Sequence, residues 1–135
     1  MKFFVKGGDG GKESGVIGFW ICEIKWLFSI VLLHFRKGSR ENFHSHAFNA
    51  YSFFISGIVE EEHLNGKKII WKASFYPKYT SKNTFHKVKA LKETWCLSFR
   101  GPWSNSWYEF SPKNKEFLLL TNKRKILNKF KLVQN

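Results

Sequence analysis

Three of the five histidines have the spacing of a metal site. His44 and His46 are separated by one residue, and on a β-strand such residues project from the same face. Both imidazoles can then reach one divalent cation, at the roughly 2.0–2.1 Å of a metal–nitrogen bond. His86 begins a strand-like run about forty residues later and is the expected third ligand. An H-x-H pair also occurs in strands that bind no metal, so this prediction depends on the fold.

The rest of the sequence predicts a β-structure that positions these histidines. Short runs of β-branched and aromatic residues alternate with turn residues, which is typical of an all-β sandwich or barrel. Hydrophobic residues make up 43% of the 135 residues and aromatic residues 19%, so the chain can fill a core. The expected strands are 16–23, 27–35, 43–47, 51–61, 68–72, 85–88, 94–100, 107–110 and 117–120.

Three local signals refine this prediction. Asn65-Gly66 lies between two apolar runs and predicts a β-hairpin with a type I′ turn. The segment 122–131 is the exception to the β pattern, because it places Ile126, Leu127 and Phe130 on one side of a short C-terminal helix. The glycine-rich segment 7–11 is expected to be a loop, since it lacks the G-K-[ST] ending of a phosphate-binding loop.

Composition limits the partners and the location of the protein. Lys and Arg number 23 against 10 Asp and Glu, and the resulting charge of +13 favours anionic partners. The densest basic stretch, 113–131, shows no groove-reading pattern, so nucleic-acid binding is an alternative only. Charged residues interrupt the apolar stretch 16–35, which predicts two buried strands and no membrane partner. Without a signal peptide or a C-x-x-C pair, a cytoplasmic protein is expected.

The order of these elements resembles the two-motif layout of the cupin superfamily. Phe43-His44-Ser45-His46, a strand ending at Gly57, a hairpin, Pro77 and then His86 follow that layout in order. The segments 40–46 and 95–103 are similar to the corresponding segments of small single-domain cupins of bacteria and phages. The resemblance covers about residues 27–110, and it implies a single cupin-type β-barrel over 1–135, that is, a double-stranded β-helix or jelly roll.

Two features depart from the family pattern. Ala50 and Tyr51 stand where the family has an acidic metal ligand, and Pro77 is followed by Lys78-Tyr79 where the family has a P-x-G turn. By the resemblance, three histidines alone would hold the metal, as in the thiol dioxygenase branch of the cupins. Iron(II) is the expected cofactor, with zinc, nickel or manganese as alternatives. Three neutral imidazoles leave the cation its full charge, which favours a small anionic substrate.

Other residues are candidates for the remaining roles. A guanidinium group binds a carboxylate bidentately, and the candidate substrate-binding residues are Arg36, Arg40 and Arg100, with surface ion pairing as the alternative. Tyr51 and Tyr79 are the candidate proton donors. By strand parity His34 is expected to point inward with Ile30 and Leu32, and Cys96 is expected to be a small buried residue.

Three functions remain open at this point. The first is a metal-dependent oxidoreductase of the dioxygenase kind acting on a small anion. The second is a cupin module that binds a small molecule or nucleotide without turning it over. The third is a basic nucleic-acid-binding protein, and in each case two barrels can pair through an exposed sheet edge to form a homodimer.

Overall fold

The computed structural model describes residues 1–9, 14–39, 43–121 and 125–131, and in these ranges it contains strands and no helix. The strands are β1 (Lys2–Gly8), β2 (Val16–Ile24), β3 (Phe28–Phe35), β4 (Gly38–Ser39), β5 (Phe43–His44), β6 (Ala50–Ser56), β7 (Ile58–His63), β8 (Lys68–Lys72), β9 (Lys78–Thr80), β10 (His86–Ala90), β11 (Thr94–Arg100), β12 (Ser106–Ser111), β13 (Glu116–Thr121) and β14 (Ile126–Lys131). The described part of the chain therefore offers no helix that could cross a membrane.

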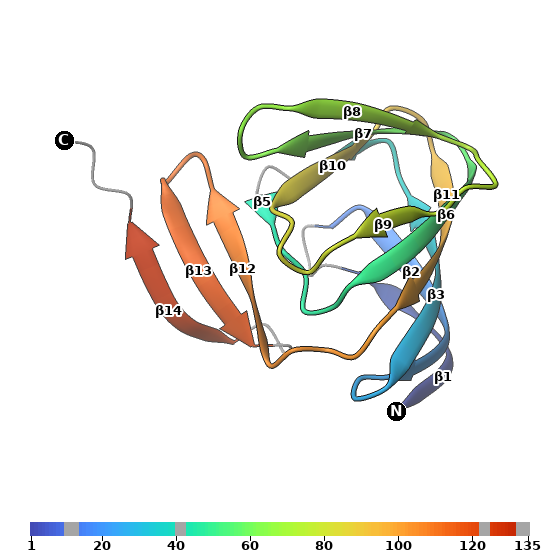
Figure 1. The fold of residues 1–135 in the computed structure, drawn as a ribbon, viewed down its shortest axis with the longest axis horizontal. Coiled ribbons are helices and arrows are strands. Elements are labelled where there is room, and N and C mark those ends of the chain that lie inside the picture. The colour runs from blue at the N-terminus through green and yellow to red at the C-terminus, as the bar shows by residue number, and fades with distance from the viewer. Residues whose placement is uncertain (10–13, 40–42, 122–124, 132–135) are drawn as a thin grey trace.

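The strands form two antiparallel sheets that enclose the interior (Figure 1). One sheet has the order β1-β2-β3-β11-β6-β9. The other has the order β14-β13-β12-β5-β10-β7-β8, with β4 paired to β10. In Figure 1, β12, β13 and β14 extend to one side of the barrel. The expected all-β, jelly-roll architecture is confirmed.

Alternation along each strand decides which side chains enter the core. On β3, Val31 and Leu33 are buried, with 0% and 6% exposed, whereas Leu32 and His34 lie on the opposite face of the sheet. Trp20, Phe54, Val59, Ala90 and Cys96 complete this core cluster. The expectation that His34 points inward was wrong. Its side chain lies on the outer face of the sheet, where its ring stacks on that of Trp95 with 4.4 Å between the ring centroids.

Gly57 lies where the chain passes from one sheet to the other, and it divides the expected strand 51–61 into β6 and β7. Its φ is +94°, a conformation that L side chains rarely adopt. A Cβ atom there would also collide with Oγ1 of Thr94 and the carbonyl oxygen of Glu93. The residue is therefore required by backbone geometry and by close packing against the start of β11.

The hairpin and the C-terminal segment show what local sequence signals miss. The hairpin β7–β8 is confirmed, but Gly66 has a positive φ and Asn65 does not, so the turn is not type I′. The C-terminal helix was wrong over 126–131, because this segment pairs with β13 as β14; residues 122–124 lie outside the described ranges. Hydrogen bonding to an exposed strand edge outweighs the helical spacing of the apolar residues.

Candidate metal centre

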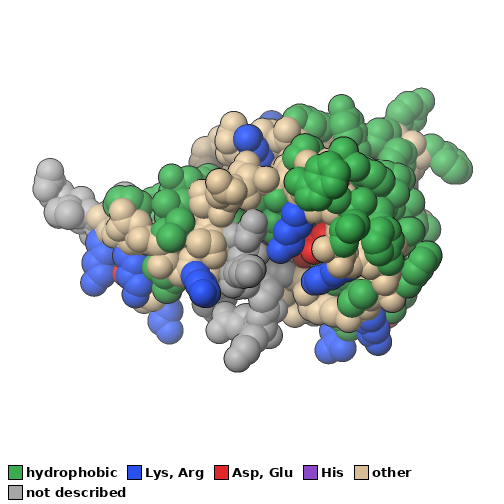
Figure 2. Space-filling view, turned by 90° about the horizontal axis from the view of Figure 1, so that it is seen from below, with side chains coloured by type: hydrophobic (Ala, Val, Ile, Leu, Met, Phe, Trp, Pro, Cys, Tyr) green, Lys and Arg blue, Asp and Glu red, His purple; other side chains and the backbone are tan. Residues whose placement is uncertain are grey.

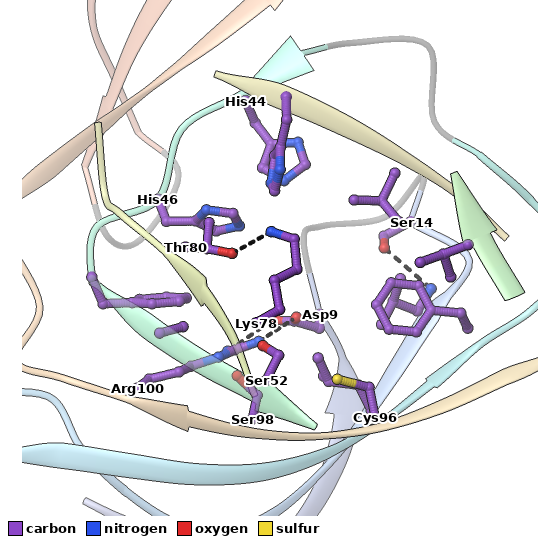
Figure 3. Close-up of a pocket in the computed structure, with 18 of the residues that line it drawn as sticks. Asp9, Ser14, His44, His46, Ser52, Lys78, Thr80, Cys96, Ser98 and Arg100 are labelled. Carbon is purple, nitrogen blue, oxygen red and sulfur yellow. Dashed lines mark hydrogen bonds and ion pairs between the residues drawn. The ribbon is translucent and has the colours of Figure 1, made fainter. Parts of the chain in front are cut away.

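Two neighbouring strands and the loop after β5 bring the three histidines together. His44 on β5 and His86 on β10 are direct partners in the antiparallel ladder. His46 follows β5, where the backbone N–H of Ser45 donates to the carbonyl of Tyr108 at 2.9 Å and the N–H of Tyr108 donates to Oγ of Ser45, also at 2.9 Å. The segment is thus held against β12, and both imidazoles face the barrel interior (Figure 3).

The three imidazoles lie close enough together to bind one cation. One ring nitrogen from each of His44, His46 and His86 lies within 4.8 Å of the other two. The ring centroids are 4.8 to 5.0 Å apart, and the rings meet edge to face instead of stacking. Nitrogens that share one cation at about 2.1 Å are about 3.0 Å apart in octahedral and about 3.4 Å apart in tetrahedral coordination, so the rings would have to close by about an ångström or more around a bound ion. Among the described residues, these three histidines form the one group of at least three side chains that could hold a metal ion.

Glu61 on β7 fixes the orientation and protonation of His86. Its Oε2 atom lies 2.5 Å from Nδ1 of His86, and both side chains are almost fully buried. Burial lowers the pKa of His86, which keeps the imidazole neutral, and the hydrogen bond to Glu61 only partly opposes this effect. A neutral ring that donates from Nδ1–H presents a lone pair at Nε2. This Nε2 is buried and has no hydrogen-bond partner among the described residues, as expected for a metal ligand.

Glu61 is itself held by a polar network. Burial alone would raise the pKa of its carboxyl, but hydrogen bonds from His86 and Lys78 outweigh burial and hold the pKa well below its usual range. Nζ of Lys78 lies 2.8 Å from Oε2 of Glu61 and donates to Oγ1 of Thr80 at 2.7 Å. Nε2 of His63 and Nε1 of Trp71 lie 3.1 and 3.4 Å from the other carboxylate oxygen. The carboxylate is therefore ionised and fully engaged.

The site opens into a cavity of about 600 Å³ inside the barrel. The three histidines, Glu61 and Lys78 line part of it, and aromatic side chains including Trp71 and Trp103 line much of the rest. Figure 3 shows the tip of Lys78 extending from β9 toward Thr80 and the imidazoles. A small molecule can thus contact the metal position, a buried ammonium group and apolar walls at once.

No protein-family model matches the sequence, and no curated protein matches it in sequence. Solved structures do match the fold. A cupin superfamily protein from Desulfitobacterium hafniense aligns with a TM-score of 0.55 at 13% identity, over 70% of this chain and 84% of its own. A sugar phosphate isomerase from a cupin superfamily, from Silicibacter pomeroyi, gives 0.60 at 8% identity, over 87% and 76%. A Klebsiella pneumoniae protein with a double-stranded β-helix domain gives 0.55 at 17%, over 74% and 80%.

The chain has the cupin fold. These identities are too low to carry a function across, so the likeness confirms the resemblance at the level of architecture only. Within this fold, His44, His46 and His86 are close enough together to bind a metal ion.

The candidate substrate-binding arginines differ from one another in their surroundings. Arg100 is buried and lines the cavity, but its Nη2 and Nη1 atoms lie 2.8 and 3.3 Å from the carboxylate of Asp9. Arg36 lines the cavity at the end of β3 and is exposed. Arg40 lies outside the described residues. Of the two described arginines, Arg100 is therefore buried in an ion pair, whereas Arg36 is exposed at the cavity.

The candidate proton donors and the predicted buried thiol also have defined positions. Tyr51 and Tyr79 are about half exposed, their rings contact each other at a tilt with 5.0 Å between the centroids, and they do not line the cavity. Cys96 is 1% exposed, as expected, and burial raises the pKa of its thiol to about 11. The described residues of the basic stretch 113–131 lie around β13 and β14, and none of them lines the cavity.

Sequence reasoning missed Glu61, His63 and Lys78. Glu61 sits in a run of three acidic residues, and its parity with buried Val59 was the available signal that it points inward. Lys78 stood out only as a departure from the P-x-G turn. His63 lies next to the hairpin turn, where its ring is half-buried and lies against Glu61.

Proposed function

We propose that this cupin is a metal-dependent enzyme that holds one divalent cation, iron(II), on His44, His46 and His86 and acts on a small anionic molecule. The observation that carries the proposal is the buried pair of His86 and Glu61. A carboxylate behind a metal-binding imidazole is the usual way in which proteins fix the ring and strengthen it as a ligand. When bound, the cation supplies Lewis acidity and a position for a negatively charged group of the substrate.

Lys78 supports the anionic character of the substrate. An ammonium group has three N–H donors, and Glu61 and Thr80 take two of them. The remaining donor belongs to a side chain that is only 10% exposed, so its interaction with an anion is weakly screened by water. We propose that Lys78 binds the negatively charged group beside the cation, and that Arg36 attracts anions at the mouth of the cavity.

The walls of the cavity support a substrate with an apolar part. Trp71 lies under the ammonium group of Lys78, with 5.2 Å between Nζ and the ring centroid, and Trp103 packs on Phe48 at 5.1 Å. These rings exclude water from one side of the bound molecule. A small carboxylate, thiolate or phosphate that carries a short apolar group fits this arrangement best.

A non-catalytic binding module is the second candidate. The observation that favours it is the commitment of Glu61 to four partners, together with the outward position of Tyr51 and Tyr79. Neither the carboxylate nor the two phenols is placed to move a proton for a substrate at the three histidines.

Oxygen consumption separates the two candidates. Protein loaded anaerobically with iron(II) is mixed with aerated buffer and a panel of small carboxylates, thiols and phosphates, and both oxygen and the added compound are followed. The enzyme hypothesis predicts that at least one class is consumed by the wild type and not by His46→Ala. Tight binding of an anion without any turnover would instead establish the binding module.

A further inference from the structure

The outer face of the six-stranded sheet is almost entirely apolar. Positions that point away from the cavity on β2, β3, β11, β6 and β9 form two continuous rows across the strands. One row pairs Phe19, Leu32, Leu97 and Phe53, and the next pairs Ile30, Phe99, Tyr51 and Tyr79. We call these eight residues the apolar face. Its rings contact one another, with centroid distances of 5.9 Å for Phe53–Phe99 and 5.0 Å for Tyr51–Tyr79.

Three residues of the apolar face are exposed, and the other five are partly buried. Tyr51 and Tyr79 are 52% and 53% exposed and Phe99 39%, while Ile55, beside the face on β6, is 56% exposed. Figure 2 shows hydrophobic side chains gathered over the part of the molecule that carries this sheet. Five strands of about six residues span roughly 24 Å by 20 Å. The flat area of the face is thus about 480 Å², whereas a specific interface buries about 800 Å² of accessible surface on each partner, so exposed side chains beside the face must contribute the remainder.

Charge distribution distinguishes this face from the rest of the molecule. The chain carries +13, yet among the described residues the lysine, histidine and acidic side chains that reach the face lie at its borders: Lys6 on β1, and His34 with Glu93 at one end. Two copies of so basic a chain repel each other over most of their surfaces. They can approach closely through a face without charges. A different, acidic partner would find no cationic side chain there with which to form ion pairs.

A neighbouring loop extends the apolar surface. Residues 73–77 connect β8 to β9, and the backbone N–H of Ser74 donates to the carbonyl of Phe54 on β6 at 3.0 Å. In this loop Phe75 is 99% exposed and Tyr76 86% exposed. Rings so exposed on a loop anchored at the border of the face are placed to close over the edge of a facing sheet.

We propose that two copies of this chain dimerise by stacking their apolar faces. Sheets pack face to face at about 10 Å with interdigitating side chains, and a twofold axis lets each row of rings meet its own counterpart. The cavities remain open on the far side of each sheet. The proposal does not depend on the metal site.

Analytical ultracentrifugation of the purified full chain at about 100 µM tests this proposal, since a dimer with a micromolar Kd is almost fully associated there. The wild type is expected to sediment as a dimer. Phe99→Glu places two carboxylates in the interface and is expected to weaken the dimer by at least about 100-fold. Ile70→Glu makes a similar change at a 47% exposed position on β8, outside the face, and is expected to remain dimeric.

Tyr51→Lys serves as a second interface variant, because a half-exposed position tolerates lysine whether or not Phe99→Glu folds. Near-ultraviolet circular dichroism identifies the folded variants. A monomeric wild type at this concentration would overturn the proposal, as would folded interface variants that stay dimeric. Dissociation of the Ile70→Glu variant to the same extent would also overturn it, because the contact would then not be specific to this face.

Discussion

Oε2 of Glu61 lies 2.5 Å from Nδ1 of His86, and this contact joins the three-histidine cluster to a buried polar network. The partners are diagonal neighbours on adjacent strands, since β7 and β10 pair His86 with His63 and Val88 with Glu61. Lys78 reaches the same carboxylate oxygen from β9, in the other sheet. The orientation of one imidazole is therefore set by groups from three strands.

Removing the carboxylate of Glu61 should weaken metal binding. Glu61→Gln keeps the shape of the side chain but loses the charge that holds His86 in the ligand tautomer, and such changes reduce metal affinity by about 10- to 100-fold. Competition titration with a chelator measures the effect. Glu60→Gln is the matched control, because Glu60 points outward on the same strand and lies 3.8 Å from surface Lys68. Equal affinities of the two variants would contradict this role.

The stability of the metal-free protein should decrease in acid. The pKa of His86 lies below its usual 6.5 and the pKa of Glu61 below its usual 4.5. Both groups therefore bind protons more readily in the unfolded chain, so protonation favours unfolding. Their stabilisation is fully present above about pH 6.5 and is lost as the pH falls through the usual pKa values toward the folded-state ones.

Thermal unfolding in the presence of a chelator, from about pH 8 to pH 4, measures this dependence. The Tm should fall on acidification, and Glu61→Gln should flatten the part of the curve below about pH 4.5. A Tm that rises toward acid pH, or an unchanged slope in the variant, would show that the pair does not titrate in this way.

Gly57→Ala should destabilise the barrel strongly. The substitution combines a positive φ with a collision against Thr94 and the backbone of Glu93, and a loss of roughly 3 kcal/mol or more in the free energy of unfolding is expected. Gly66→Ala separates the two effects, because its φ is also positive but nothing lies within 4 Å of the new Cβ, so about 1 kcal/mol is expected. Urea denaturation gives both values, and similar losses in the two variants would refute the packing argument.

Lys78→Met should reduce anion affinity without emptying the site. The methionine fills the apolar contact with Trp71 but removes the buried charge, and at least about a tenfold loss in the affinity of the nickel-loaded protein for a small carboxylate is expected. Calorimetric titration measures the affinity, with metal content determined in parallel. Lys82→Met is the control, since Lys82 is exposed. Unchanged anion affinity in Lys78→Met at full metal loading would exclude Lys78 from the substrate site.

The sequence predicted those features that depend on local chemistry. The strands 68–72 and 94–100 have the expected limits, because apolar alternation bounded by turn residues determines them. His44, His46 and His86 converge as expected, although His46 lies just beyond β5 and not within a strand. The H-x-H spacing still holds, since an extended backbone keeps both rings on one side.

Features set by long-range pairing were not predictable in this way. Glu61 became a partner of His86 only through the register of β7 against β10, which one sequence does not reveal. The misplacement of His34 has a related cause, because a strand with apolar residues on both faces gives no local indication of which face is buried. Segment 126–131 formed a strand because β13 offered an edge, a tertiary effect that outweighs helical periodicity.

Metal content of untagged protein tests the central claim most directly. Elemental analysis should find close to one divalent metal ion per chain in the wild type and in His34→Ala, whose imidazole stacks on Trp95 outside the barrel. The same measurement on folded His46→Ala should find the metal lost or greatly reduced. A wild type that takes up no iron, nickel or zinc, or a His46→Ala variant that retains the wild-type amount, would contradict the three-histidine centre.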